Sequence, residues 1–222
     1  MALILNIDSS TEQASISVAE NGQSLVLLTN ADQKDHADWI HIAIQQGLQA
    51  TGKKVSDLEA IAVTAGPGSY TGLRVGMATA KGLCYALGLP FITVNTLEAM
   101  AAAVGEVGAE VIYICPMIDA RRMEVFTALY DTEGREIIPP CAMILENDSF
   151  SAYLTTGKVL FFGNGSEKWK GLHPQNALFR QIPFTAATLA GLSHKKYEKL
   201  DFSTIAYTEP LYVKDFYTPA AK

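Results

Sequence analysis

The fold of this chain is decided by residues 61–83, IAVTAGPGSYTGLRVGMATAKGL. The apolar run that starts at Ile61 is typical of a buried strand, and the segment 66–68 ends that strand in a sharp turn. Either Ser69 or Thr71 can then cap a helix, because both side chains carry an oxygen that accepts a backbone N–H. The stretch therefore predicts a strand, a glycine-rich turn and a helix.

Small residues lie along one side of that helix. Gly72, Gly76 and Ala80 are spaced four apart and so share one face. Each glycine inside a helix costs about 1 kcal/mol relative to alanine, which indicates that another group must come very close. The sequence leaves open whether that group is a phosphate at the turn or a protein at the helix.

Composition limits the classes of function. The chain has 222 residues, of which 49% are hydrophobic and 18% charged, so a proper core is expected. Its net charge of -6, without a long basic run, argues against a protein that holds nucleic acid alone. The first ten residues, MALILNIDSS, predict a buried strand rather than a signal peptide, and no stretch is long enough for a membrane span. Three widely spaced cysteines indicate reduced thiols and a cytoplasmic protein.

Periodicity predicts a mixed sheet in the first half of the chain. Three antiparallel strands are followed by a helix, a strand, a helix, a strand and a helix. The expected elements in that order are Leu3–Ile7, Gln13–Ala19, Ser24–Thr29, Asp38–Ala50, the strand at Ile61, the helix to Leu87, Pro90–Val94 and Asn95–Val104.

The second half partly repeats the first. A strand over Val111–Ile118 ends at Asp119, as the first strand ends at Asp8, and in both cases a strand and a glycine turn follow. Another buried strand, 159–163, leads into a glycine loop, and a helix is expected over Thr185–Lys196. We interpret this as an internal duplication, with domains 1–106 and 107–222, whose last helix can pack back onto the first domain.

Polar residues at the end of the first strand are candidates for a phosphate site. Asp8, Ser9, Ser10 and Thr11 offer hydroxyls and backbone N–H groups, and an aspartate at a strand end can hold Mg²⁺ through water. The alternative is an Asx or Ser/Thr turn that only closes the hairpin. The turn at 66–71 satisfies neither common nucleotide motif, because Thr71 stands where each motif requires a glycine.

No metal or nucleophile motif is present. The four histidines, His36, His41, His173 and His194, have no metal-ligand spacing, and neither a G-x-S-x-G nor an H-E-x-x-H pattern occurs.

Five segments together resemble the TsaB (YeaZ) family. They are ILNIDSSTEQASISV, VTAGPGSYTGLRVGMATAKGL, VNTLEAMA, MIDARRMEVFTALY and EPLYVKDF, and they cover nearly the whole chain in order. The resemblance implies an α/β protein with the actin-like ATPase (ASKHA, RNase H-like) fold. This fold has two related subdomains, each with a mixed sheet flanked by helices.

The resemblance also implies a role and partners. TsaB-like proteins are non-catalytic scaffolds that bind and activate TsaD, which installs N6-threonylcarbamoyladenosine at position 37 of tRNAs reading ANN codons. The expected partners are TsaD, TsaE through the TsaB–TsaD complex, tRNA indirectly, and a second copy when TsaD is absent. No cofactor is expected, apart from a nucleotide that the TsaD interface could hold, and no membrane.

One departure from the TsaD pattern bears on catalysis. Where TsaD has two metal-binding histidines, this chain reads VNTLEAM, with Thr96 and Met100 in their places. Neither side chain replaces an imidazole as a ligand, so we expect no metal site and no transferase activity.

The resemblance places the partner surface on the two helices of the first domain. The residues expected to contact the partner are Trp39, Ile42, Gly72, Leu73, Gly76, Met77, Ala80 and Leu83. The alternative is that the glycines face their own sheet. A second functional hypothesis is an ATP- or phosphate-handling enzyme of the actin-like superfamily that uses Asp8, Ser10 and the loop Gly163–Gly165.

Overall fold

The structure is a computed structural model that describes residues 2–32, 36–172 and 175–214. It divides into two compact units. Unit 1 consists of Met1–Glu106 and Ile182–Pro210, and unit 2 consists of Val107–Gln181 and Leu211–Lys222. The segment 182–210 therefore interrupts the expected second domain. His173 and the last two residues of EPLYVKDF lie outside the described residues.

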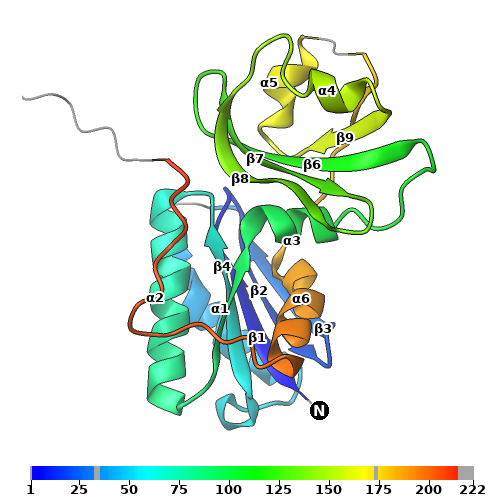
Figure 1. Cartoon of the computed structure of the whole chain (residues 1–222). Helices are drawn as coiled ribbons and strands as arrows, with labels where there is room; N and C mark the ends of the chain where they lie inside the picture. The colour runs from blue at the N-terminus through cyan, green and yellow to red at the C-terminus, as the bar shows by residue number, and fades with distance from the viewer. Residues whose placement is uncertain (1, 33–35, 173–174, 215–222) are drawn as a thin grey trace, which may run out of the picture. The chain divides into compact units, whose positions relative to one another are not determined.

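Unit 1 is built on a five-stranded mixed sheet in the order β3-β2-β1-β4-β5 (Figure 1). The strands β1, β2 and β3 are antiparallel, whereas β4 and β5 run parallel to β1. Their bounds are β1 Leu3–Asp8, β2 Ala14–Glu20, β3 Gln23–Asn30, β4 Ala60–Gly66 and β5 Phe91–Asn95. The hairpin between β2 and β3 turns at Asn21 and Gly22, which both have positive φ, as a two-residue hairpin turn requires.

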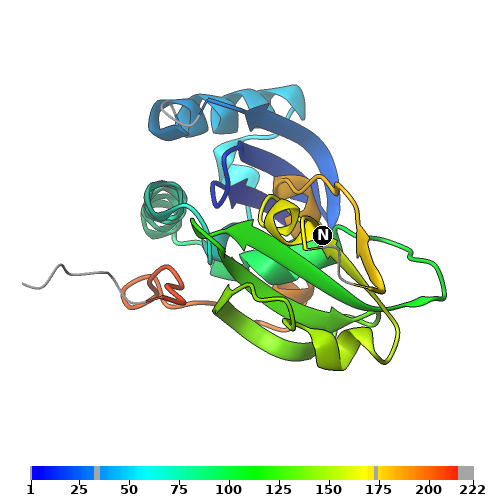
Figure 2. The same ribbon diagram turned by 90° about the horizontal axis from the view of Figure 1, so that it is seen from above.

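Four helices cover the two faces of this sheet. The helices α1 (His36–Ala50) and α2 (Tyr70–Leu87) lie against one face and contact each other. Figure 2 shows α2 end-on and α1 along its length. The helices α3 (Thr96–Ala102) and α6 (Ala186–Glu198) lie against the other. The side chains of strand β1 point alternately to the two faces of the sheet. Leu5 and Ile7 pack in the core beneath α1 and α2, whereas Ile4 packs in the core beneath α6.

Helix α6 belongs to unit 1 through buried polar contacts as well as apolar packing. The hydroxyl of Ser193 donates to Oδ1 of Asn6 at 2.6 Å. The backbone N–H of Ala186 donates to Oγ of Ser15 at 2.8 Å. These bonds satisfy buried polar groups of β1 and β2, so the sheet of unit 1 is completed by residues from both ends of the chain.

Unit 2 repeats the sheet plan. Its strands lie in the order β10-β9-β6-β7-β8, with β6, β7 and β8 antiparallel and β9 and β10 parallel to β6. The two sheets therefore have the same topology, which confirms the expectation of related subdomains. The bounds are β6 Val111–Asp119, β7 Glu124–Asp131, β8 Glu136–Ile144, β9 Lys158–Phe162 and β10 Ala177–Phe179, with short helices α4 Ser151–Leu154 and α5 Ser166–Lys170.

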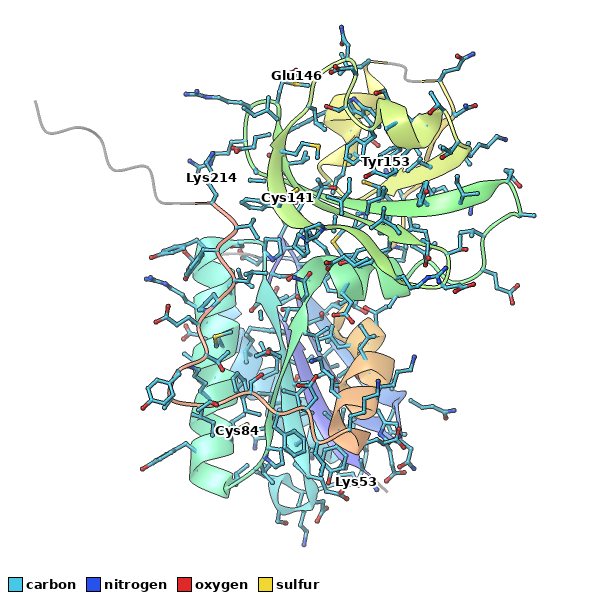
Figure 3. The ribbon with its side chains drawn as sticks, viewed as in Figure 1. Lys53, Cys84, Cys141, Glu146, Tyr153 and Lys214 are labelled. Carbon is cyan, nitrogen blue, oxygen red and sulfur yellow. The ribbon has the colours of Figure 1, made fainter. Side chains whose placement is uncertain are left out.

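An aromatic cluster fills the core of unit 2. The Trp169 ring lies 4.5 Å from the ring of Phe161 and 5.3 Å from that of Phe150, centroid to centroid. Tyr153, labelled in Figure 3, meets Tyr113 edge to face at 5.4 Å. These rings hold α4 and α5 against the sheet.

None of the helices within the described ranges is long and apolar enough to cross a membrane.

We expect the substitution Trp169→Ala to lower the free energy of unfolding of unit 2 by about 3–5 kcal/mol, because it opens a cavity in a fully buried cluster. Trp169→Phe should cost much less, since the buried indole N–H has no hydrogen-bond partner to lose among the described residues. Urea unfolding followed by circular dichroism tests this. A loss below about 1 kcal/mol for Trp169→Ala would show that the cluster does not support unit 2.

Candidate functional site

The candidate site of unit 1 lies where β1 and β4 end at the same edge of the sheet. Asp8 is the last residue of β1, and Thr64 lies near the end of the neighbouring β4. Asp8, Ser9 and Ser10 are fully buried, whereas Thr11 is partly exposed. Three of the four residues of the candidate phosphate turn therefore have no access to solvent.

Only one of the two oxygens of the Asp8 carboxylate accepts hydrogen bonds from the described residues. Its Oδ1 accepts hydrogen bonds from the Ser10 N–H at 3.1 Å, the Ser10 hydroxyl at 2.6 Å and the Thr64 hydroxyl at 2.8 Å. Its Oδ2 is buried and has no partner among the described residues. Burial raises the pKa of Asp8, and these hydrogen bonds oppose the shift without reversing it. The arrangement is an Asx turn around a carboxyl whose neutral form is favoured.

The small face of α2 packs against this same turn. A Cβ on Gly72 would lie 1.9 Å from the Ser9 carbonyl oxygen, and one on Gly76 would lie 2.3 Å from the Ser9 hydroxyl. A Cβ on Gly68 would lie 2.2 Å from the Ser10 carbonyl oxygen. The group that comes close to α2 is therefore the backbone of the β1–β2 turn.

Hydrogen bonds fix this contact. The Ser9 hydroxyl donates to the carbonyl oxygen of Gly72 at 2.7 Å, and the Ser69 N–H donates to that of Ser10 at 2.7 Å. Ser69 is also the N-cap of α2, and its Oγ accepts the N–H of Gly72 at 3.3 Å. The two turns therefore pack directly against each other, and the hydrogen bonds from Ser10 to Asp8 Oδ1 form an Asx turn.

The equivalent edge of unit 2 carries an ion pair. Asp119 ends β6, as Asp8 ends β1, and its Oδ1 accepts from Lys168 Nζ at 2.7 Å and from the Arg121 N–H at 2.6 Å. Partial burial works against ionisation, but these two donors outweigh it and lower the pKa of Asp119. The Gly163–Gly165 loop packs tightly here, since a Cβ on Gly165 would lie 2.9 Å from the carbonyl carbon of Ile118. Gly165 thus has a packing role.

Most of the residues expected to contact a partner are buried within unit 1. The five buried ones lie on the inner face of α2, and this corrects their assignment to a partner surface: Gly72, Leu73, Gly76, Met77 and Ala80. The alternative, that the glycines face their own sheet, is the one observed. Trp39 and Leu83 are partly buried against the same core, and Ile42 is 55% exposed.

The outer faces of α1 and α2 form a different surface. Tyr85 is 83% exposed on α2, next to a second row of small residues, Ala78, Gly82 and Ala86, that also face solvent. A Cβ on Gly82 would meet nothing within 4 Å. We call the set Ile42, Ala78, Gly82, Leu83, Tyr85 and Ala86 the α1–α2 surface. The sequence analysis missed its α2 row, although the same spacing of four was visible there.

A groove adjoins the α1–α2 surface. Its volume is about 580 Å³, and it is lined by His41, Ile44, Gln45, Leu48, Gln49, Lys53, Lys54, Val55 and Leu83. Ile44 and Leu48 are buried and contribute an apolar floor. Lys53 (Figure 3) is held by an ion pair with Glu20 at 2.8 Å. The groove therefore combines apolar and polar groups, as protein-binding sites do.

The two positions at which TsaD has metal-binding histidines lie on α3 in this chain. Thr96 and Met100 are both buried, and the Thr96 hydroxyl has no hydrogen-bond partner among the described residues. Over the same part of the chain, no group of three or more His, Cys, Asp or Glu residues is arranged to hold a metal ion.

Comparison with protein families identifies a match over most of the chain. The model of the family TsaD, tRNA N6-adenosine threonylcarbamoyltransferase, matches residues 29–207. The chain is 29% identical to the tRNA threonylcarbamoyladenosine biosynthesis protein TsaB of Bacillus subtilis, over 75% of this chain and 73% of that protein. It is 34% identical to the protein of the same name from Escherichia coli, over 60% of this chain and 57% of that protein.

Solved structures show the same fold. YeaZ from Pseudomonas aeruginosa is 24% identical, with a TM-score of 0.76 over 96% of this chain and 100% of that one. The activator of 2-hydroxyisocaproyl-CoA dehydratase from Clostridium difficile, solved with bound ADPNP, is 10% identical, with a TM-score of 0.51 over 89% of this chain and 97% of that one. These similarities confirm the expected actin-like fold.

Replacing Gly72 with alanine should lower the free energy of unfolding by about 3 kcal/mol or more, because the new methyl group meets the backbone of Ser9. Gly82→Ala in the same helix is the matched control. It should raise stability by up to about 1 kcal/mol, since its methyl group enters open space and alanine favours helix. Thermal and urea unfolding measure both, and equal effects would contradict the close packing described here.

The substitution Asp8→Asn should stabilise the protein at neutral pH. Because the pKa of Asp8 is raised by folding, ionisation above that pKa destabilises the folded state, and this penalty vanishes as pH falls toward 3.8. Asparagine keeps the acceptor Oδ1 but carries no charge. Unfolding measured from pH 4 to 8 should show a gain that grows with pH, and a loss of stability at pH 8 would contradict a buried neutral carboxyl.

Proposed function

Because the chain belongs to the TsaD family and, within it, to the TsaB (YeaZ) proteins of tRNA threonylcarbamoyladenosine biosynthesis, we propose that it is the non-catalytic subunit that binds and activates TsaD. In this role it holds TsaD in its working shape in the complex that modifies position 37 of tRNAs reading ANN codons. The chain itself transfers no group.

The observation that carries this proposal is the chemistry at the start of α3. Thr96 and Met100 stand where the resemblance places the two histidines of TsaD, and both side chains are buried. A neutral hydroxyl and a thioether are poor ligands for a catalytic divalent metal. A chain of this family that lacks both imidazoles is therefore suited to support catalysis by a partner.

The α1–α2 surface and its groove are the proposed TsaD-binding face. Ala78, Gly82 and Ala86 leave room for a partner helix to come close, and Ile42 and Tyr85 supply apolar and aromatic area at their side. The groove beside Leu83 can take side chains of that helix. This replaces the buried face of α2 as the location of the interface.

Further partners follow from the same role. TsaE is expected to join through the TsaB–TsaD complex and tRNA to be held mainly by TsaD, because this chain has a net charge of -6. We propose no cofactor for the chain itself, a nucleotide only at the TsaD interface, a homodimer when TsaD is absent, and a cytoplasmic location.

The residues that a second hypothesis, an ATP- or phosphate-handling enzyme, would use are mostly engaged in packing. Ser9 and Ser10 are buried against α2, and Gly165 packs against β6.

Omission of this chain from a reconstituted mixture tests the proposal. The mixture contains the matching TsaD and TsaE, tRNA, ATP and a source of threonylcarbamoyl-adenylate, and modified adenosine is counted by mass spectrometry. We expect omission to abolish modification. Gly82→Arg should reduce both TsaD binding and modification by about tenfold or more, because a long charged side chain then lies on the α1–α2 surface.

Gly191→Arg is the matched control, since Gly191 is an exposed glycine of α6 with no atom within 4 Å of its Cβ position. It should leave binding and modification unchanged. Undiminished modification without the chain would refute the scaffold role. Full activity of Gly82→Arg alone would refute only the location of the interface.

A further inference from the structure

The groove beside α1 has a polar side and an apolar floor. Residues spaced by four share one face of a helix, so α1 lines the groove with two parallel rows. One row is polar and consists of His41, Gln45 and Gln49, whereas the other is apolar and consists of Ile44 and Leu48. Residues 41 to 49 span about 12 Å, at about 1.5 Å per residue, which is the length of about two turns of a helix. The groove therefore matches a short stretch of a partner helix.

The turn that follows α1 brings two lysines to the end of the groove. Gly52 has a φ of +67°, and its N–H donates to the carbonyl oxygen of Gln49 at 3.1 Å. The Lys53 N–H donates to that of Leu48 at 3.0 Å. A left-handed glycine commonly ends a helix in this way. Lys53 and Lys54 come directly after the turn, and both line the groove.

The two lysines differ in their partners. The ammonium of Lys53 is paired with Glu20. Lys54 is exposed, and within the described ranges its ammonium forms no ion pair. Its backbone N–H donates to Oδ2 of Asp57 at 2.8 Å, so the main chain at Lys54 is fixed. The part of the groove lining that the structure describes contains neither aspartate nor glutamate. The positive charge of Lys54 is therefore available to a group from outside this chain.

Given the proposed function, on which this inference rests, we propose that the groove binds an acidic helix of TsaD. An apolar side chain of that helix lies over Ile44 and Leu48, and a carboxylate about one turn away accepts a hydrogen bond from the Lys54 ammonium. The helix continues past Leu83 onto the α1–α2 surface, because Leu83 belongs to both. The partner segment is thus defined by its chemistry, an apolar residue with an aspartate or glutamate three or four positions away.

The charge of the groove favours TsaD over a second copy of this chain as the occupant. The helices α1 and α2 contain a single acidic residue between them, Asp38, in the first turn of α1. A second copy that met this surface through the same helices would therefore offer the groove few carboxylates. Specificity is a difference in affinity, and a charge without a partner lowers the affinity for the wrong occupant. Lys54 is accordingly the residue that we assign to the choice of partner.

Binding of TsaD to charge variants of the full chain tests the proposal. Lys54→Glu should weaken the affinity for TsaD by about tenfold or more, because like charges then face each other across the interface. Lys54→Arg keeps the charge and should leave the affinity nearly unchanged. Lys199→Glu makes the same change of charge at an exposed residue after α6, so it is the matched control and should not affect binding. The effect of Lys54→Glu should shrink as salt is added, because salt screens exposed charges.

Carbodiimide cross-linking of the complex with TsaD, read by mass spectrometry, tests the contact directly. The reagent joins a lysine amine to a carboxylate in contact with it as an amide, without inserting a spacer. We expect a product that joins Lys54 to an aspartate or glutamate of TsaD, and Lys54→Arg should abolish it, because arginine has no amine that reacts. The pair Lys53–Glu20, whose charged atoms lie 2.8 Å apart, is the internal control and should cross-link in the free chain and in the complex.

Two results would overturn this proposal and leave the proposed function standing. One is TsaD binding that Lys54→Glu does not weaken. The other is a product between Lys53 and Glu20 without one between Lys54 and TsaD, or with Lys54 joined to a second copy of this chain instead. Failure of the unaltered chain to bind TsaD would refute the proposed function itself, and this proposal with it.

Discussion

The close approach of the β1–β2 turn to helix α2 is the constraint on which unit 1 depends. Atoms of Ser9 and Ser10 occupy the space where side chains at positions 68, 72 and 76 would otherwise lie, so all three positions are glycine. The contact fixes the distance of α2 from the sheet, aligns the N-terminus of α2 with the ends of β1 and β4, and closes the turn around Asp8. In this chain the turn is buried, and its role is to connect the sheet to α2 through direct packing and hydrogen bonds.

The two units share one sheet topology but differ in the chemistry at the end of the first strand of each sheet. Asp8 and Asp119 end equivalent strands. Asp8 is buried, with one oxygen that has no partner in the part of the chain that the structure describes, whereas Asp119 is paired with Lys168. Burial favours the neutral form of the first carboxyl, and a nearby ammonium favours the ionised form of the second. A duplicated fold therefore does not keep the chemistry of its strand ends: the Asp8 carboxyl is buried, whereas the Asp119 side chain remains 43% exposed beside Lys168.

Sequence reasoning predicted the strands and helices of unit 1 and their order because these follow from local patterns, but it did not predict the short elements α4, α5 and β10 of unit 2. The alternation in residues 14–19, the Asn21–Gly22 turn and the buried run from Ile61 are visible without tertiary information. The spacing of Gly72 and Gly76 also predicted a close approach correctly. It could not reveal which group approaches, because spacing places residues on one face of a helix without showing whether that face is inner or outer. The same limit explains why the exposed row at Ala78, Gly82 and Ala86 was missed.

The division of unit 1 between both ends of the chain has a consequence for biosynthesis. When residues 1–106 have left the ribosome, the sheet of unit 1 still lacks α6, and Ile4 and Ala62 on that face have nothing from α6 to cover them. The edge of β5 still lacks Ser203 as well. Most of unit 2 is synthesised in between, so the nascent chain must keep the first half in a soluble, incomplete state while the middle emerges. Completion of unit 1 therefore waits until residues 182–210 have been synthesised, and a message truncated before residue 182 yields an open sheet rather than a smaller stable domain.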